Sequence, residues 1–329
     1  MVQVTEDPGR REPVRPGAPP PEPVAHWPGE LVELPGGQVY VRCTPAADGA
    51  EPAVFVHGLG GSSTNWTDLM DLLSRPVQGR PDARVLACTA FDLRGFGLSP
   101  PPRNGDYSID GHATAVIELI QALGGEPVHL ISNSMGGAIS TRVAARRPDL
   151  VRTLSMVSPA LPDLRPRPLP MRLALAAIPG VGATIIRWAR KLPADLRTDR
   201  ALRDVYTDPG VVHPSRRREE IEEVLRRDTL IYSTDALIMS ARSLVTEYLK
   251  LGRTSLWRDV AHVGAPALIL HGSHDRLVNP VMAAKAARAF PMARVLVLPG
   301  VGHVAMMERP AQVATEIRAF LDWADAPLS

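Results

Sequence analysis

Short runs of consecutive apolar residues recur along the chain from about residue 53. Such runs are typical of strands that are buried on both faces of a parallel sheet. They stand in EPAVFVHG, RVLACTAFDL, PVHLIS, RTLSMVS, PALILHG and ARVLVLPG. Segments of helical length lie between them, at 108–123, 135–147, 281–290 and 311–323. The alternation predicts an α/β fold: a doubly wound, mostly parallel sheet with helices on both faces.

Three other segments complete the predicted organisation. LVELPGGQVYVRC indicates a hairpin that turns at Pro35, Gly36 and Gly37. Residues 159–262 contain helical stretches and prolines but no convincing buried strand, so we expect a helical lid insertion above the carboxyl ends of the strands. Residues 1–28 form a proline-rich leader that we expect to be flexible, and the core takes residues 29–158 and 263–329.

Composition excludes some classes of protein. The 37 basic and 35 acidic residues nearly cancel, and no basic tract carries interleaved aromatic residues, so no nucleic-acid partner is expected. Cys43 and Cys88 have neither a disulfide framework nor the spacing of metal ligands. The N-terminal residues lack the apolar core of a signal peptide, and no run of about 20 apolar residues predicts a membrane span. We therefore expect a cytoplasmic protein.

The stretch LISNSMGGAIS places Ser134 between a strand-like and a helix-like segment. A serine on such a sharp turn projects its hydroxyl above the sheet, where the first N–H groups of the helix also point. The strand and helix backbones approach closely there, and Gly136 meets the need for a small neighbour. This pattern favours a nucleophile for acyl transfer, although a serine in a packing seam would show it too.

These residues resemble the nucleophile elbow of the α/β-hydrolase family, G-x-S-x-G, with Ser132 in place of the first glycine. VFVHGLGGSS is similar to the oxyanion loop of that family, whose glycines let backbone N–H groups turn toward a developing negative charge. The resemblance implies that the backbone N–H groups of Leu59 and Met135 form the oxyanion hole. It covers nearly the whole chain from about residue 30.

The resemblance also implies a catalytic triad. LILHGSHDRLVNP supplies Asp275 and VLVLPGVGHVAMMERP supplies His303, each just past a strand-like run. Ser134, Asp275 and His303 follow the family's order of nucleophile, acid and histidine. His303 would take the proton of Ser134, and Asp275 would orient the imidazole ring. Asp163 stands at an alternative acid position that some members use.

A wider set of residues is expected near the substrate. His57 is expected mainly to brace the oxyanion loop. Apolar side chains of the lid form a pocket for the acyl group or belong to its core, since an apolar stripe at helical spacing suits either. The predicted substrate-binding residues are His57, Gly58, Asn133, Trp188, Met239 and Val304. The mixed charges of RRREEIEEVLRRD indicate a solvated helix face.

No metal or organic cofactor is expected. His271, His274 and Asp275 stand in HGSHD, which lacks the H-x-H-x-D-H spacing of binuclear hydrolases, and there is no H-E-x-x-H. Dehalogenases and epoxide hydrolases of the family use an aspartate where this chain has Ser134, so those reactions are disfavoured.

The sequence predicts a serine hydrolase that cleaves a small or medium, apolar carboxylic ester through an acyl-enzyme. Two alternatives stay open. One is hydrolysis of a carbon–carbon bond in vinylogous diketones, because NSMGGA resembles the elbow of those enzymes, although Val304 replaces the tryptophan that usually follows their histidine. The other is a non-catalytic, ligand-binding member of the fold. We expect a monomer or a homodimer.

Overall fold

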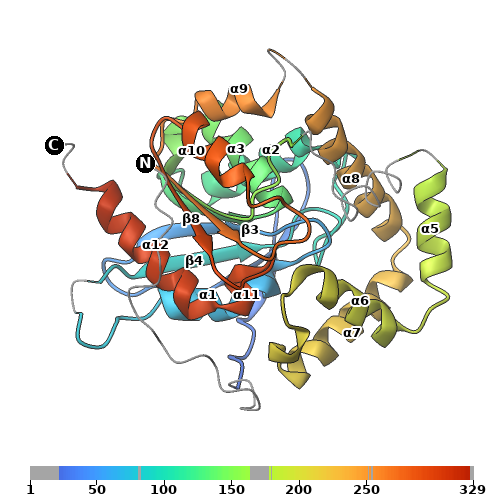
Figure 1. Cartoon of the computed structure of the whole chain (residues 1–329). Coiled ribbons are helices and arrows are strands. Elements are labelled where there is room, and N and C mark those ends of the chain that lie inside the picture. The colour runs from blue at the N-terminus through green and yellow to red at the C-terminus, as the bar shows by residue number, and fades with distance from the viewer. Residues whose placement is uncertain are drawn as a thin grey trace.

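A single twisted sheet forms the centre of the computed structural model, which describes residues 22–80, 83–163, 178, 180–250, 252 and 255–326. The strands of this sheet are Gly29–Val32 (β1), Val39–Cys43 (β2), Glu51–Val56 (β3), Leu86–Phe91 (β4), Val128–Asn133 (β5), Val151–Val157 (β6), Ala267–Gly272 (β7) and Ala293–Leu298 (β8). Their spatial order is β1-β2-β4-β3-β5-β6-β7-β8 (Figure 1). The six apolar runs of the sequence correspond to β3 through β8, as predicted.

Parallel pairing joins β3 through β8, and antiparallel pairing adds β2 and β1 at one edge. The hairpin of β1 and β2 pairs Leu31 with Tyr40 and turns at Gly37, whose φ of 119° suits glycine. Because β3 to β8 are parallel, the loops after them meet at one edge of the sheet, where open α/β folds bind ligands. The predicted fold class is confirmed.

Helices cover both faces of the sheet, and each face has its own apolar core (Figure 1). One layer contains Ile109–Ala122 (α2), Met135–Arg146 (α3), Leu256–Ala261 (α9) and Met282–Ala289 (α10), and the other contains Thr67–Leu73 (α1), Ala305–Glu308 (α11) and Pro310–Ala324 (α12). Leu119 and Ile139 are fully buried in the first core, and Trp66 and Phe320 in the second. The sheet is therefore apolar on both faces, which explains its continuous apolar runs.

In the described residues between β6 and β7, four helices lie beyond one end of the strands and form the structure called the cap below (Figure 1). They are Val181–Ala189 (α5), Ala194–Val205 (α6), Pro214–Thr229 (α7) and Ser233–Leu249 (α8). The lid limits of 159 and 262 stay a prediction, but α9 lies inside them and packs on α3. Leu256 and Val260 of α9 are fully buried in the first core, so α9 belongs to the core layer.

The described end of the predicted flexible leader is bound between core and cap. Arg216 of α7 donates hydrogen bonds to the Val24 carbonyl (2.6 Å) and to Asp68 of α1 (3.1 Å). His26 contacts Thr67 of α1 at 2.6 Å and Glu219 of α7 at 3.0 Å. These contacts hold residues 24 and 26 against core and cap, the flexibility of the leader stays a prediction, and residues 1–21 lie outside the described part. None of the described helices is both long and apolar enough to cross a membrane.

Candidate active site

Ser134 stands on a strained turn between β5 and α3. Its backbone has φ 54° and ψ −119°, a conformation that costs a non-glycine residue about 1–3 kcal/mol. Hydrogen bonds hold the turn: the Ser134 N–H donates to the Val157 carbonyl at 3.1 Å, and its carbonyl accepts from Gly137 and Ala160, each at 2.9 Å. The structure thus places a hydroxyl at the start of a helix, the geometry of a nucleophile elbow.

The elbow forms although Ser132 occupies its first position. Ser132 is fully buried in β5, where it pairs with Val56 and Met156. The strict steric need is at Gly136, where a Cβ would lie 2.3 Å from the Val56 carbonyl oxygen and 2.7 Å from that of His57. The replacement at residue 132 is therefore compatible with the turn.

His303 and Asp275 form a buried hydrogen-bonded pair. His303 Nδ1 lies 2.8 Å from Asp275 Oδ2, and the other carboxylate oxygen accepts from the N–H groups of Leu277 (2.8 Å) and Val278 (2.9 Å). Burial acts to raise the pKa of Asp275, but the charge and hydrogen bond of His303 and the backbone donor outweigh it and lower the pKa below its ordinary value. An ionised Asp275 requires the proton on Nδ1, which leaves Nε2 as the base.

Asn133 connects the elbow to the histidine loop. Its side-chain nitrogen donates to the carbonyls of Val157 (3.0 Å) and His303 (3.2 Å), and the residue is only 4% exposed. Asn133 therefore has a structural role, and its contact with substrate stays a prediction. Gly58 meets the elbow from the other side, since a Cβ there would lie 3.0 Å from the Ser134 Cβ. The structure therefore brings the oxyanion loop, Ser134 and the His303 backbone together.

His57 fixes the oxyanion loop. Its Nδ1 lies 2.7 Å from the Gly58 carbonyl, and its Nε2 accepts from the Leu93 N–H at 2.9 Å. Burial lowers the pKa of His57, which keeps the ring neutral. Both ring nitrogens are in use and the ring is fully buried, which fits the expected bracing role, while the substrate contact of His57 stays a prediction.

The two residues assigned to the oxyanion hole lie on either side of this junction. Leu59 follows Gly58 in the loop, and Met135 is the first residue of α3 and is fully buried. The N–H groups of the first helical turn have no partner within their own helix, so that of Met135 suits an oxyanion. The roles of Leu59 and Met135 stay predictions.

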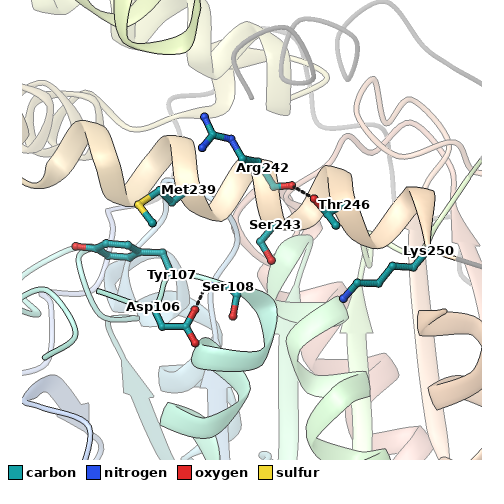
Figure 2. Close-up of a pocket in the computed structure, with 8 residues that line it drawn as sticks. All are labelled: Asp106, Tyr107, Ser108, Met239, Arg242, Ser243, Thr246 and Lys250. Carbon is teal, nitrogen blue, oxygen red and sulfur yellow. Dashed lines mark hydrogen bonds between the residues drawn. The ribbon is translucent and has the colours of Figure 1, made fainter. Parts of the chain in front are cut away.

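Three further residues are predicted to bind substrate. Trp188 on α5 of the cap is 65% exposed, and Val304, next to His303, is 7% exposed and packs in the second core. Met239 borders a separate surface pocket of about 320 Å³ between α8 and the start of α2 (Figure 2). That pocket is lined by Asp106, Tyr107, Ser108, Met239, Arg242, Ser243, Thr246 and Lys250. None of these side chains comes from the loops of the candidate triad, and the substrate contacts of Trp188, Met239 and Val304 stay predictions.

The cap is bonded directly to the histidine loop, which sequence reasoning missed. The His303 N–H donates to the carbonyl of Val205 at the end of α6 (2.8 Å). The Glu308 carboxylate accepts from the N–H groups of Gly302 (2.9 Å) and Thr207 (3.2 Å), and Glu308 is 8% exposed. The position of His303 thus depends on a cap segment about a hundred residues away in sequence. Backbone contacts of this kind leave no sequence signal.

Helix α7 also reaches the loops beside the elbow. Arg227 donates to the carbonyl of Gly60 in the oxyanion loop (3.2 Å), and Arg226 donates to the carbonyl of Gly97. The predicted solvated face of RRREEIEEVLRRD is therefore wrong for these two arginines, which join cap and core. The run of charged residues in the sequence marks this helix as highly charged, but its pattern does not show which of the charged side chains face the core.

Another carboxylate, Asp163, and another histidine, His271, lie near the His303–Asp275 pair. Burial raises the pKa of Tyr248 on α8, with further increases from Asp163 and Asp275, so both carboxylates lie near this tyrosine. Asp275 has the hydrogen bond to His303 at 2.8 Å, which favours it as the acid. His271 on β7 is buried, and burial lowers its pKa to about 4.

Within the described ranges, no group of three or more His, Cys, Asp or Glu residues is arranged to hold a metal ion.

Comparison with known proteins agrees with this geometry. Residues 52–310 match the family model of the alpha/beta hydrolase fold. Lipase 3 of Moraxella sp. (strain TA144) is 28% identical over 273 residues, covering 83% of this chain and 78% of that lipase. Naproxen esterase from Bacillus subtilis superposes with a TM-score of 0.67 at 21% identity, covering 90% of this chain and 93% of that one. A meta-cleavage product hydrolase from Pseudomonas fluorescens IP01 gives 0.70 at 19%, covering 90% and 98%. At these identities the two structures show the fold alone.

Proposed function

The chain belongs to the α/β-hydrolase fold family, and we propose that it is a serine hydrolase that cleaves a small or medium carboxylic ester through an acyl-enzyme. The observation that carries the proposal is the strained Ser134 turn beside a histidine that is paired with a buried carboxylate. Strained backbone of this kind is concentrated at functional sites, and the φ of 54° at Ser134 coincides here with a histidine–carboxylate pair. Similarity in sequence to a lipase supports the ester as substrate.

The proposed reaction uses these groups in sequence. Nε2 of His303 takes the proton of the Ser134 hydroxyl while the serine oxygen attacks the ester carbonyl carbon. Backbone N–H groups of Leu59 and Met135 stabilise the oxyanion, and His303 returns the proton to the departing alcohol. Water, deprotonated by His303, then attacks the acyl-enzyme, and the acid leaves as Ser134 regains its proton. Asp275 stabilises the imidazolium in both steps.

Hydrolysis of a carbon–carbon bond is the second candidate. The NSMGGA elbow favours it, and a meta-cleavage product hydrolase is among the proteins of similar fold. Against it, the residue after His303 is Val304, whose side chain packs in the second core and offers no aromatic wall to a diketone. The ester therefore ranks first.

A substrate panel tests this ranking. We expect the wild type to hydrolyse p-nitrophenyl esters of two- to eight-carbon acids faster than a vinylogous diketone, and Ser134→Ala to lose about 10⁴-fold or more in kcat. Ser140→Ala is the matched control, because Ser140 is a fully buried serine on the same helix. Faster diketone cleavage would favour the second candidate. Equal ester hydrolysis by Ser134→Ala would exclude the mechanism.

A further inference from the structure

Helix α5 exposes an apolar stripe to solvent. Val181, Ile185 and Trp188 follow one another at i, i+4 and i+7, the spacing of a single helix face, and are 38%, 44% and 65% exposed. Ile178, 45% exposed, extends the stripe, and its carbonyl accepts from the Val181 N–H at 3.2 Å. An amphipathic helix normally turns its apolar stripe toward the core. Here α5 packs its other side against α8, and the stripe points away from the protein.

Positive charge borders this stripe. Arg187 is exposed, and the Lys191 ammonium lies 4.1 Å from the centroid of the Trp188 ring. Arg190 is occupied by an ion pair with Asp228 at 3.2 Å. Residues 181–192 contain no aspartate or glutamate, so no acidic side chain of this segment neutralises Arg187 and Lys191. A surface that combines aliphatic side chains, an exposed indole and basic residues fits an interface that is apolar beneath and negative at its surface.

Helix α5 lies at the outer edge of the molecule, on the side of α8 that is remote from the sheet (Figure 1). A flat surface approaching from outside would therefore meet α5 before it met the core.

We propose that α5 docks the protein peripherally on anionic phospholipid membranes. Ile185, Trp188 and their apolar neighbours enter the headgroup region, where tryptophan is favoured, and Arg187 and Lys191 contact lipid phosphates. A second copy of the chain is the weaker occupant, because two such faces would bring like charges together. This binding does not depend on the ester reaction. It adds a membrane-surface partner to a protein in which no described helix spans a bilayer.

Vesicle binding by the full-length protein tests the proposal. We expect co-sedimentation with vesicles of equal parts phosphatidylglycerol and phosphatidylcholine, weakened by high salt, and much less with phosphatidylcholine alone. The double variant Ile185→Ser with Trp188→Ser should bind at least ten-fold more weakly. Replacing Arg187 or Lys191 with glutamine should each cost roughly five-fold on anionic vesicles, the equivalent of about 1 kcal/mol per basic residue.

Leu123→Ser is the matched control, because Leu123 is 48% exposed but lies at the end of α2 on the core. It should bind like the wild type. Absence of wild-type binding to anionic vesicles would overturn the proposal, as would equal binding by the double variant. A wild-type dimer that ignores vesicles and becomes monomeric in the double variant would show that the stripe joins two copies, which also overturns it. Circular dichroism checks that each surface variant remains folded.

Discussion

Nδ1 of His303 lies 2.8 Å from Oδ2 of Asp275, and both residues are almost fully buried. This pair fixes the proton on one ring nitrogen, so that the other is available as a base toward Ser134. Asp275 thus orients and stabilises the imidazole ring, and His303 accepts the proton.

The roles of this pair predict the effect of Asp275→Asn. An amide at this position can donate to Nδ1 and favour the wrong tautomer, so we expect kcat to fall by about 10⁴-fold with little change in fold. Steady-state kinetics on an ester, with circular dichroism, provide the measurement. Asp163→Asn is the control and should retain activity. The opposite pattern would transfer the acid role to Asp163.

The burial of His271 predicts that the folding stability of the protein depends on pH. Its pKa is lowered by burial to about 4 in the folded protein from the ordinary value of about 6.5, so below about pH 6.5 the unfolded chain binds the extra proton. Folding stability should therefore fall as pH decreases from 6.5 toward 4, by about 3 kcal/mol from this residue. Above pH 6.5 the ring is neutral in both states and contributes nothing to the pH dependence.

Urea unfolding at pH 7 and pH 4.5 measures this contribution. His271→Asn should lose less stability between the two pH values than the wild type, and His262→Asn, which changes an exposed histidine, should match the wild type. If His271→Asn kept the full pH dependence of the wild type, its burial as a neutral ring would be refuted.

The hydrogen bonds of Glu308 predict that the cap helps to hold His303 in position. Its carboxylate accepts from Gly302 and Thr207, so Glu308→Ala leaves two backbone donors without a partner and should destabilise the protein by about 1–3 kcal/mol. We also expect a lower kcat, because the loop that positions His303 loosens. Glu308→Gln keeps an acceptor oxygen and should recover part of both losses. Thermal melting and kinetics of the two variants separate the loss of the acceptor oxygens from the loss of the negative charge. Identical losses in Glu308→Ala and Glu308→Gln would count against the acceptor role.

The hydrogen bonds of Arg216 predict that this side chain holds residues 22–28 in place. In Arg216→Ala the bonds to Val24 and Asp68 disappear, and amide hydrogen exchange should accelerate in residues 22–28 and in the first turns of α7. Arg218→Ala alters an exposed neighbour and should leave exchange unchanged. Unaltered exchange in Arg216→Ala would mean that other contacts hold this segment.

The sheet and the elbow could be predicted because their signals are local. Continuous apolar runs identify strands that are buried on both faces, and a serine between such a run and a small-residue helix identifies the turn at Ser134. Asp275 and His303 follow strands whose ends meet at one edge, so their proximity follows from parallel topology.

The lining of the substrate site could not be predicted in the same way. Periodicity shows that α5 and α8 have apolar stripes, but it does not show toward which side each stripe points, so the sequence alone does not reveal that Trp188 is exposed and that Met239 borders a separate surface pocket. The contact between His303 and Val205 joins two backbones, which no side-chain pattern records. Asn133 shows a related difficulty, since a polar residue beside a nucleophile suits a substrate contact until its bonds to Val157 and His303 are seen.

The central claim is that His303 activates Ser134, and covalent labelling tests it most directly. The wild type and His303→Ala are each treated with a small fluorophosphonate, followed by intact mass and peptide mapping. We expect one adduct on the wild type, located at Ser134, and a labelling rate lower by orders of magnitude in His303→Ala. Labelling of a different serine, or an equal rate at Ser134 without His303, would contradict the account.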